Sequence, residues 1–324
     1  MTKESRWRID LHQKKSQKQK SNIRLWILVA GIIFLFCLGI KIYNLVNNKV
    51  WNGQDRINLV ISNGLTVLTY DPIDDGITTI NLPDNLYIDV GGGYGKYRLG
   101  AVSELGQLEK KKELLPETIQ FNLAIPVDGW ISGALDKTST EKEAKNAVLK
   151  IVFSALQRKT ETNLTTWDLL RLWIKVRGVK PSHIESLDYS KLNVLRPDTL
   201  VDKTPIFVLV SENSDLIIKK HFEDKRLQGE RYSLEVLNGT SHPGLADEAA
   251  RILGNIGGEV VGVGNTQTPF QQCFVRSEKN KSQTYTVRKI REIFACSWEE
   301  KTDVGRADIS LILGESYRQN VYSD

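Results

Sequence analysis

The distribution of apolar and polar residues divides the chain into two kinds of sequence. Residues 25–46, LWILVAGIIFLFCLGIKIYNLV, are almost continuously apolar, with Lys41 as the one charged residue. Beyond this run, short aliphatic segments bounded by turn residues predict strands. They alternate with longer segments whose apolar residues recur at helical spacing. This alternation predicts an α/β protein built in layers.

The first part of the patterned region, residues 47–195, is predicted to form one α/β core. Strands are expected at 57–61, 65–70, 77–83, 86–90 and 121–127, and helices at 105–115, 140–156 and 165–178. The clearest helix follows the capping pattern Thr140-Glu141-Lys142-Glu143. A connecting segment at 196–230 follows, with a strand at 206–210, a helix at 215–224 and a polar hinge at 225–229.

Residues 231–324 are predicted to form a second domain. Strands are expected at 232–237, 259–263, 273–276 and 309–313, with helices at 244–255 and 282–294. The order βαββαβ is that of a split βαβ, ferredoxin-like domain.

Charge changes the interpretation of the apolar run. Residues 1–24 carry eight Lys or Arg against two acidic residues, so this tail accounts for the net charge of +5 and leaves the rest near neutrality. The body of the protein therefore has no basic surface typical of nucleic-acid binding. A basic segment before 22 apolar residues predicts a cytoplasmic tail, a single transmembrane helix at 25–46 and extracytoplasmic domains. A cleaved signal peptide is the alternative, but no small-residue cleavage site follows the run.

Cysteine and histidine usage limits the chemistry. Cys37 lies in the apolar run, which leaves Cys273 and Cys296 in the predicted exported part. They could form a disulfide in an oxidising compartment or remain two buried thiols. The four His are scattered and no CxxC motif is present, so we expect no resident metal or other cofactor.

The C-terminal segment resembles a known domain. Val236-Leu237-Asn238-Gly239-Thr240, followed by Pro243-Gly244-Leu245-Ala246 and the closing strand 308–314, resembles the LytR C-terminal domain of LytR-CpsA-Psr envelope proteins. The Asn-Gly turn and the helix entrance have structural roles of their own, with Thr240 or Ser241 as the helix cap. Asn238 and Thr240 are alternatively ligand-binding candidates, because the turn precedes a helix N-terminus.

The preceding region is similar to a reduced LytR-CpsA-Psr core. The features in common are a "D-P" turn, a Leu-Pro strand end, a glycine-rich segment and the sequence FNLAIPVDG. The resemblance implies binding of a polyprenyl pyrophosphate and transfer of its glycopolymer to the cell wall with a divalent metal. It makes Asp55, Arg56, Asp84, Lys96 and Arg98 the candidate catalytic residues. Asn58 stands where the family has a carboxylate, and the arginine expected after Pro83 is absent, so the catalytic set is incomplete.

The stretch GGGYGKYRLG at 91–100 fits neither a Walker loop nor a dinucleotide fingerprint. Lys96 and Arg98 are thus either inherited phosphate contacts or solvated loop charges. We expect a non-catalytic envelope protein that binds a cell-wall polymer, a lipid-linked glycan or an envelope partner. The alternative is an active phosphotransferase, which would require Mg²⁺. The sequence does not define an oligomeric state.

Overall fold

The computed structural model describes residues 29, 31, 32, 36, 39, 49–135, 141–301 and 306–321. Val50–Leu164 and Asp168–Asp324 form one unit, and Met1–Lys49 with Thr165–Trp167 form another. Within the described residues, no helix has both the length and the apolar character needed to cross a bilayer. The predicted tail at 1–24, and all but five positions of the predicted span at 25–46, lie outside the described residues.

The first sheet of the larger unit has five strands in the order β6-β1-β2-β3-β7. Only β2 runs antiparallel to the others, so the carboxyl ends of β1, β3, β6 and β7 lie along one edge. Alternate residues of β1 point to opposite faces, as strand geometry requires. The strands are β1 (Ile57–Ile61), β2 (Thr66–Asp71), β3 (Gly76–Asn81), β6 (Gly129–Ile131) and β7 (Ile184–Asp188).

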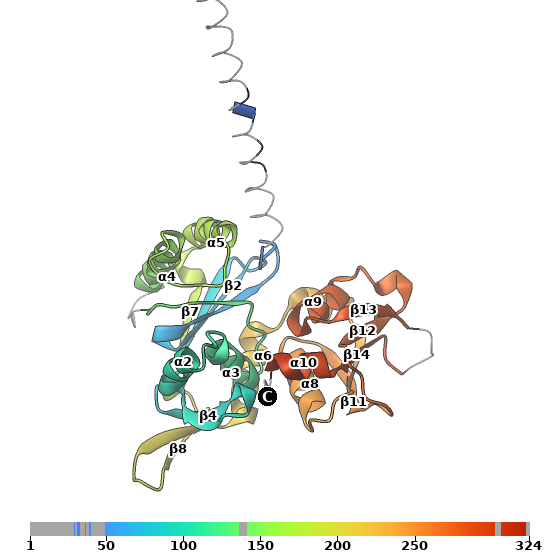
Figure 1. Cartoon of the computed structure of the whole chain (residues 1–324). Helices are drawn as coiled ribbons and strands as arrows, with labels where there is room; N and C mark the ends of the chain where they lie inside the picture. Colours follow the sequence, from blue (N-terminus) through green and yellow to red (C-terminus); the bar gives the residue numbers. More distant parts are fainter. Residues whose placement is uncertain are drawn as a thin grey trace, which may run out of the picture. The chain divides into compact units, whose positions relative to one another are not determined.

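Both faces of this sheet are covered. Ile57, Leu59 and Ile61 pack with α4 (Glu141–Leu156) and α5 (Thr166–Gly178), which lie beside the sheet in Figure 1. Val60 packs on the other face in a second apolar cluster. That cluster also contains buried residues of α2 (Leu99–Leu108), α3 (Leu114–Leu123) and α6 (Ser211–Phe222).

The strand predicted at 121–127 is wrong. Phe121–Leu123 close α3, and Ala124 ends it in the left-handed conformation. Pro116 falls in the first turn of α3, where its missing N–H costs nothing. The run FNLAIPV is therefore apolar because it is buried in the core, and not because it forms a strand. The single helix expected at 105–115 is likewise divided between α2 and α3.

A second sheet completes the core in the order β5-β4-β9-β8. The segment predicted to connect the domains, 196–230, supplies nearly all of two of these strands. The strand predicted at 206–210 corresponds to β9, which pairs with β4. The predicted polar hinge at 225–229 is also wrong. It is α7 (Lys225–Glu230), which is capped by the Asp224 carboxylate. The strands are β4 (Leu86–Val90), β5 (Gly95–Arg98), β8 (Leu195–Thr199) and β9 (Pro205–Leu209).

The C-terminal sheet has five strands in the order β11-β10-β14-β12-β13. Strands β10 and β11 are adjacent and parallel across α8 (Leu245–Asn255), and β12 and β13 are adjacent and parallel across α9 (Tyr285–Phe294). The ferredoxin-like prediction is therefore wrong, because neither βαβ unit is split by another strand. The strands are β10 (Ser233–Asn238), β11 (Glu259–Asn265), β12 (Phe274–Ser277), β13 (Ser297–Glu300) and β14 (Ile309–Leu313), and α10 (Glu315–Val321) follows.

Candidate functional site

Asp55 lies in the loop before β1, and its side chain is only 4% exposed. Arg226 of α7 donates from Nη1 to Oδ1 at 2.5 Å, and Arg288 of α9 places Nη2 3.5 Å from Oδ2. Asn52 also donates to Oδ2, at 2.5 Å. Both carboxylate oxygens are therefore occupied by protein donors, and Asp55 is an ion-pair residue joining the core to α7 and α9.

Arg56 and Asn58 lie in the segment where the sequence resemblance places a metal-binding carboxylate. Arg56 forms an ion pair with Asp71 of β2. The Asn58 amide donates to the Pro126 carbonyl at 2.8 Å and accepts from the Thr69 hydroxyl at 2.9 Å. Because both ends of this amide are satisfied inside the fold, the residue has a structural role. These residues do not fit a Mg²⁺ site, which needs ionised oxygen ligands.

Asp84, Lys96 and Arg98 lie at the other end of the first sheet or beyond it. The β1–β2–β3 register aligns Ile57 with Ile77 at one end and Ile61 with Asn81 at the other. Asp55 and Arg56 precede the first end, whereas Asp84 follows the second. At about 3.3 Å per residue the two groups are separated by at least roughly 13 Å of backbone. One pyrophosphate, which needs contacts of about 3 Å, cannot bridge them.

The two cations of the glycine-rich stretch are surface residues. Lys96 of β5 lies 3.7 Å from Asp89, and both side chains are more than half exposed. Arg98 is exposed at the N-terminal cap of α2, and the Asp84 carbonyl accepts from the Gly100 amide at 2.9 Å. The structure thus favours solvated charges for Lys96 and Arg98.

A pocket of about 360 Å³ lies at the carboxyl ends of β1 and β6. In α/β sheets this edge is the usual place for ligands, because loops diverge there. Ser62 and Asn63 follow β1 and Ser132 follows β6, while Lys111 and Lys112 come from the turn before α3. No sequence motif singled out these lysines, although the run Lys110-Lys111-Lys112 is visible in the sequence.

The pocket combines cationic groups with a buried donor. Lys112 forms an exposed ion pair with Glu161 at 2.8 Å, and the Lys111 ammonium lies 5.6 Å from the centroid of the Tyr94 ring. The Trp130 side chain is 6% exposed, and its indole N–H has no hydrogen-bond partner. An unpaired buried donor is costly. Trp130 lines the pocket, but its indole nitrogen is not exposed to it.

Glu117 of α3 lies under the start of the glycine-rich stretch. A Cβ placed on Gly91 would be 3.7 Å from that of Glu117, and the Gly91 amide donates to the Thr118 hydroxyl at 3.2 Å. Burial, with repulsion from Glu113, raises the pKa of Glu117 to about 7 although Lys111 acts in the opposite direction. The stretch therefore packs on a carboxyl group that titrates near neutrality.

No cluster of three or more His, Cys, Asp or Glu suited to a metal ion occurs in the part of the chain that the structure describes.

Asn238 and Thr240, the candidates of the C-terminal domain, form a closed turn. The Asn238 side chain accepts from the Thr240 amide at 2.9 Å and hydroxyl at 2.8 Å, and donates to the His242 carbonyl at 2.7 Å. The helix cap is Gly244, with φ +88°, and neither Thr240 nor Ser241 caps α8. These contacts favour a structural role for the turn over ligand binding.

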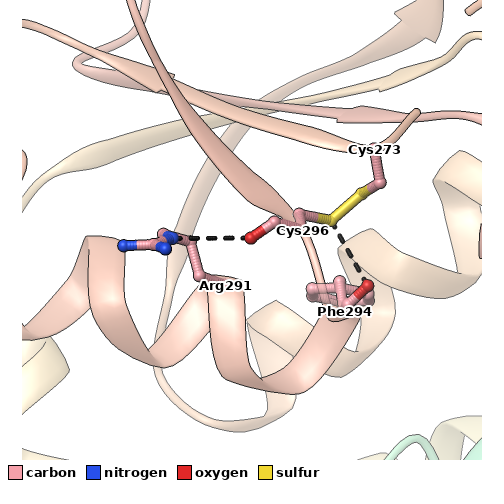
Figure 2. The surroundings of a disulfide bond; sticks show 4 residues. All are labelled: Cys273, Arg291, Phe294 and Cys296. Carbon is pink, nitrogen blue, oxygen red and sulfur yellow. Dashed lines mark hydrogen bonds between the residues drawn. A yellow bond between two sulfur atoms is a disulfide. The ribbon is translucent and has the colours of Figure 1, made fainter.

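Cys273 and Cys296 are joined by a disulfide, with Cα atoms 4.8 Å apart (Figure 2). They directly precede β12 and β13, whose first residues pair, so the bond ties the starts of two neighbouring parallel strands. Arg291 of α9 donates from Nε to the Cys296 carbonyl at 3.4 Å. Of the two alternatives, the structure thus contains the disulfide.

Residues 231–317 match the family described as LytR cell envelope-related transcriptional attenuator, the LytR C-terminal domain. This part of the chain is therefore a LytR C-terminal domain, and that prediction is confirmed. No curated protein sequence matches the chain.

Several solved structures are similar to about half of the chain. Bacillus subtilis TagT has 13% identity and a TM-score of 0.40, over 52% of this chain and 91% of its own. Bacillus subtilis YvhJ, described as a transcriptional regulator, has 16% identity and a TM-score of 0.39, over 51% and 94%. The LytR-CPS2A-psr family protein YwtF (TagT), solved with bound octaprenyl pyrophosphate lipid, has 12% identity and a TM-score of 0.38, over 52% and 90%.

Proposed function

We propose that this chain is a membrane-anchored, extracytoplasmic protein of LytR-CpsA-Psr type that binds a cell-wall glycopolymer or its lipid-linked intermediate without catalysing transfer. The LytR C-terminal domain at 231–317 supports the cell-envelope setting. The basic tail at 1–24 and the apolar run at 25–46 support the anchor and its orientation. The membrane and the polymer are then the two partners.

The observation that carries the non-catalytic assignment is the separation of the candidate catalytic residues. Asp55 is enclosed by Arg226 and Arg288, whereas Asp84 lies past the far end of β3. Phosphoryl transfer requires cations and carboxylates around one phosphate and its metal. In this fold the charges that could fill those roles are used in ion pairs or exposed at the surface.

The binding site that we propose is the pocket at the carboxyl ends of β1 and β6. Lys111 and Lys112 place positive charge at the pocket for a phosphate-bearing ligand, Lys112 beside its partner Glu161, and Trp130 forms part of the wall. Lysine acts on phosphate as a point charge, so this pocket would hold an anion without the bidentate geometry of arginine.

A binding assay with matched variants tests this proposal. The full-length chain in detergent is titrated with a polyprenyl-pyrophosphate-linked saccharide, and Lys111→Gln is compared with Lys110→Gln, which changes a neighbouring lysine that does not line the pocket. We expect Lys111→Gln to weaken binding about tenfold, the effect of a charge-assisted contact. Equal affinities of the two variants, or no binding by the wild-type protein, would contradict the proposed site.

A further inference from the structure

A larger cavity, of about 610 Å³, lies at the opposite edge of the first sheet, beside the amino ends of β3 and β7. Its floor follows from the strand register. Asn58 pairs with Thr69, and Thr69 with Thr78, so these strands place polar residues side by side. One pair further along, Arg56 and Asp71 form their ion pair. The same face is apolar at Val60, Val67 and Ile80, so it changes from apolar to polar within two residues.

The opposite wall comes from α6. Lys220 and His221 line the cavity, and His221 Nδ1 lies 2.9 Å from an Oε2 oxygen of Glu185 on β7. Polar groups from three strands and one helix therefore converge on a space whose volume is typical of small-ligand sites.

Arg56 is the residue of this cavity whose hydrogen-bond donors are least satisfied. Its side chain is 10% exposed, and Nη2 is held by Asp71. Nε and Nη1 are buried and have no hydrogen-bond partner. A buried guanidinium with two unsatisfied donors is costly, and an acceptor entering the cavity would relieve that cost.

The charges around the cavity indicate the class of acceptor. Four carboxylates line it, against the two permanent cations Arg56 and Lys220 and two histidines; the acids are Asp71, Asp74, Glu141 and Glu185. This acidic excess opposes a polyanion such as a phosphate polymer. A bare cation would leave the Arg56 donors unsatisfied. Hydroxyl groups meet both needs, because each donates to a carboxylate and accepts from a guanidinium.

We infer that this cavity is a second binding site, for an uncharged, hydroxyl-rich saccharide. Arg56 donates to saccharide oxygens, while Asp71 and Glu185 accept from saccharide hydroxyl groups. The site lies at the amino ends of the parallel strands, away from the pocket proposed above, and does not depend on that proposal.

The test uses tetra-N-acetylchitotetraose as an uncharged probe. It is titrated by calorimetry into the full-length chain, held in a polyoxyethylene detergent that has no sugar headgroup. Arg56→Lys keeps the charge but loses the planar fork, and Thr78→Val removes only a hydroxyl from the cavity wall. We expect the Arg56 variant to weaken binding about tenfold and the Thr78 variant about threefold.

Two adjacent lysines give a matched control that leaves the buried ion pair intact. Lys220 lines the cavity and Lys219 does not, although both are exposed on α6. Lys220→Ala should weaken binding and Lys219→Ala should not, while Lys111→Gln in the other pocket should have no effect. The inference is overturned by absence of binding up to about 10 mM probe, at the weak end of measurable affinity. It is also overturned by equal affinities across the cavity variants, or by inorganic pyrophosphate competing for the site.

Discussion

At the scale of single residues, Glu117 carries a proton that matters for stability. Burial raises its pKa to about 7, helped by Glu113. The folded protein therefore holds this proton to higher pH than the unfolded chain does. Its contribution to stability is complete below the unfolded pKa of about 4.5 and is lost as the pH rises through about 7.

Glu117→Gln should remove this pH dependence. Between pH 5 and pH 8 the wild-type free energy of unfolding should fall by roughly 2 kcal/mol more than that of the variant, after allowance for solvent screening. Urea denaturation at the two pH values measures the difference. The exposed Glu104→Gln should behave like the wild type, and parallel profiles for Glu117→Gln and the wild type would contradict the prediction.

Gly239 lies at a position where there is no space for a side chain. Its Asn-Gly context suggests a positive φ, but the structure gives that conformation to Gly244 instead. A Cβ on Gly239 would lie 2.8 Å from the Leu313 carbonyl oxygen of the neighbouring strand. The glycine is therefore needed because backbone approaches it closely, as in a packed strand end.

Gly239→Ala should consequently lower the free energy of unfolding by about 2 kcal/mol, as overpacking against backbone does. Gly254 on α8 is the control, since nothing lies within 4 Å of its added Cβ. Gly254→Ala should stabilise the protein by up to about 1 kcal/mol through helix propensity. Denaturant unfolding of both variants measures these changes. An unchanged free energy of unfolding for Gly239→Ala would contradict the close packing.

The residue types in the sequence identified charged candidates for a catalytic site, but they did not identify the ion-pair partners of these residues. Asp55 and Arg56 are adjacent in sequence, yet Asp55 pairs with Arg226 and Arg288, and Arg56 pairs with Asp71. Both partners of Asp55 are more than 150 residues away and cannot be inferred from local spacing, whereas Asp71 lies 15 residues from Arg56 on the neighbouring strand. The sequence therefore identifies the residues whose charge suits a phosphate or metal site. The structure shows which of them already form ion pairs within the protein.

At the scale of elements, local pattern predicted most of the early strands and the amphipathic helices. The clearest successes are the strands at 57–61 and 86–90 and the helix expected at 140–156, which is observed at Glu141–Leu156. Strand β13 was missed because Ser297-Trp298-Glu299-Glu300 is short, charged and at a sheet edge. Without β13 the element order matched a ferredoxin-like fold, so one missed edge strand changed the predicted topology.

The disulfide acts at this scale, since it ties β12 to β13. It closes a loop with a sequence separation of 23 residues. Cys273→Ala combined with Cys296→Ala should destabilise the protein by about 3 kcal/mol through the restored entropy of the unfolded chain. Thermal unfolding with and without reductant provides the measurement. The double variant should be insensitive to reductant, and a wild-type protein equally insensitive would contradict the prediction.

At the scale of the whole molecule, the C-terminal domain and the core are joined by polar contacts as well as apolar ones. Arg251 of α8 pairs with Asp215 of α6 at 2.7 Å, and Asn255 donates to the Ala124 carbonyl at 3.2 Å. Burial of Lys289 alone would lower its pKa, but nearby carboxylates, Asp128 first among them, raise it. Lys289 therefore remains charged, and its ammonium lies 3.7 Å from the carboxylate of Asp128, which directly precedes β6.

The Asp55 ion pairs should contribute to the electrostatic part of this coupling. Asp55→Asn should cost about 2 kcal/mol, because it removes a buried carboxylate that pairs with two partly exposed arginines. Asp74→Asn is the comparison, since Asp74 also pairs with α7, through Lys225, but both side chains are more than half exposed. That change should cost less than about 1 kcal/mol. Equal losses in chemical denaturation would show that burial does not set the strength of these pairs.

We propose that the chain binds a lipid-linked polymer without transferring it. The most direct test follows a labelled polyprenyl-pyrophosphate-linked saccharide with the full-length chain, Mg²⁺ and a cell-wall acceptor, and measures release of the polyprenyl phosphate. We expect the substrate to remain intact, with no release above a protein-free control. Mg²⁺-dependent release that is abolished by Asp84→Ala and by Arg98→Ala would contradict it.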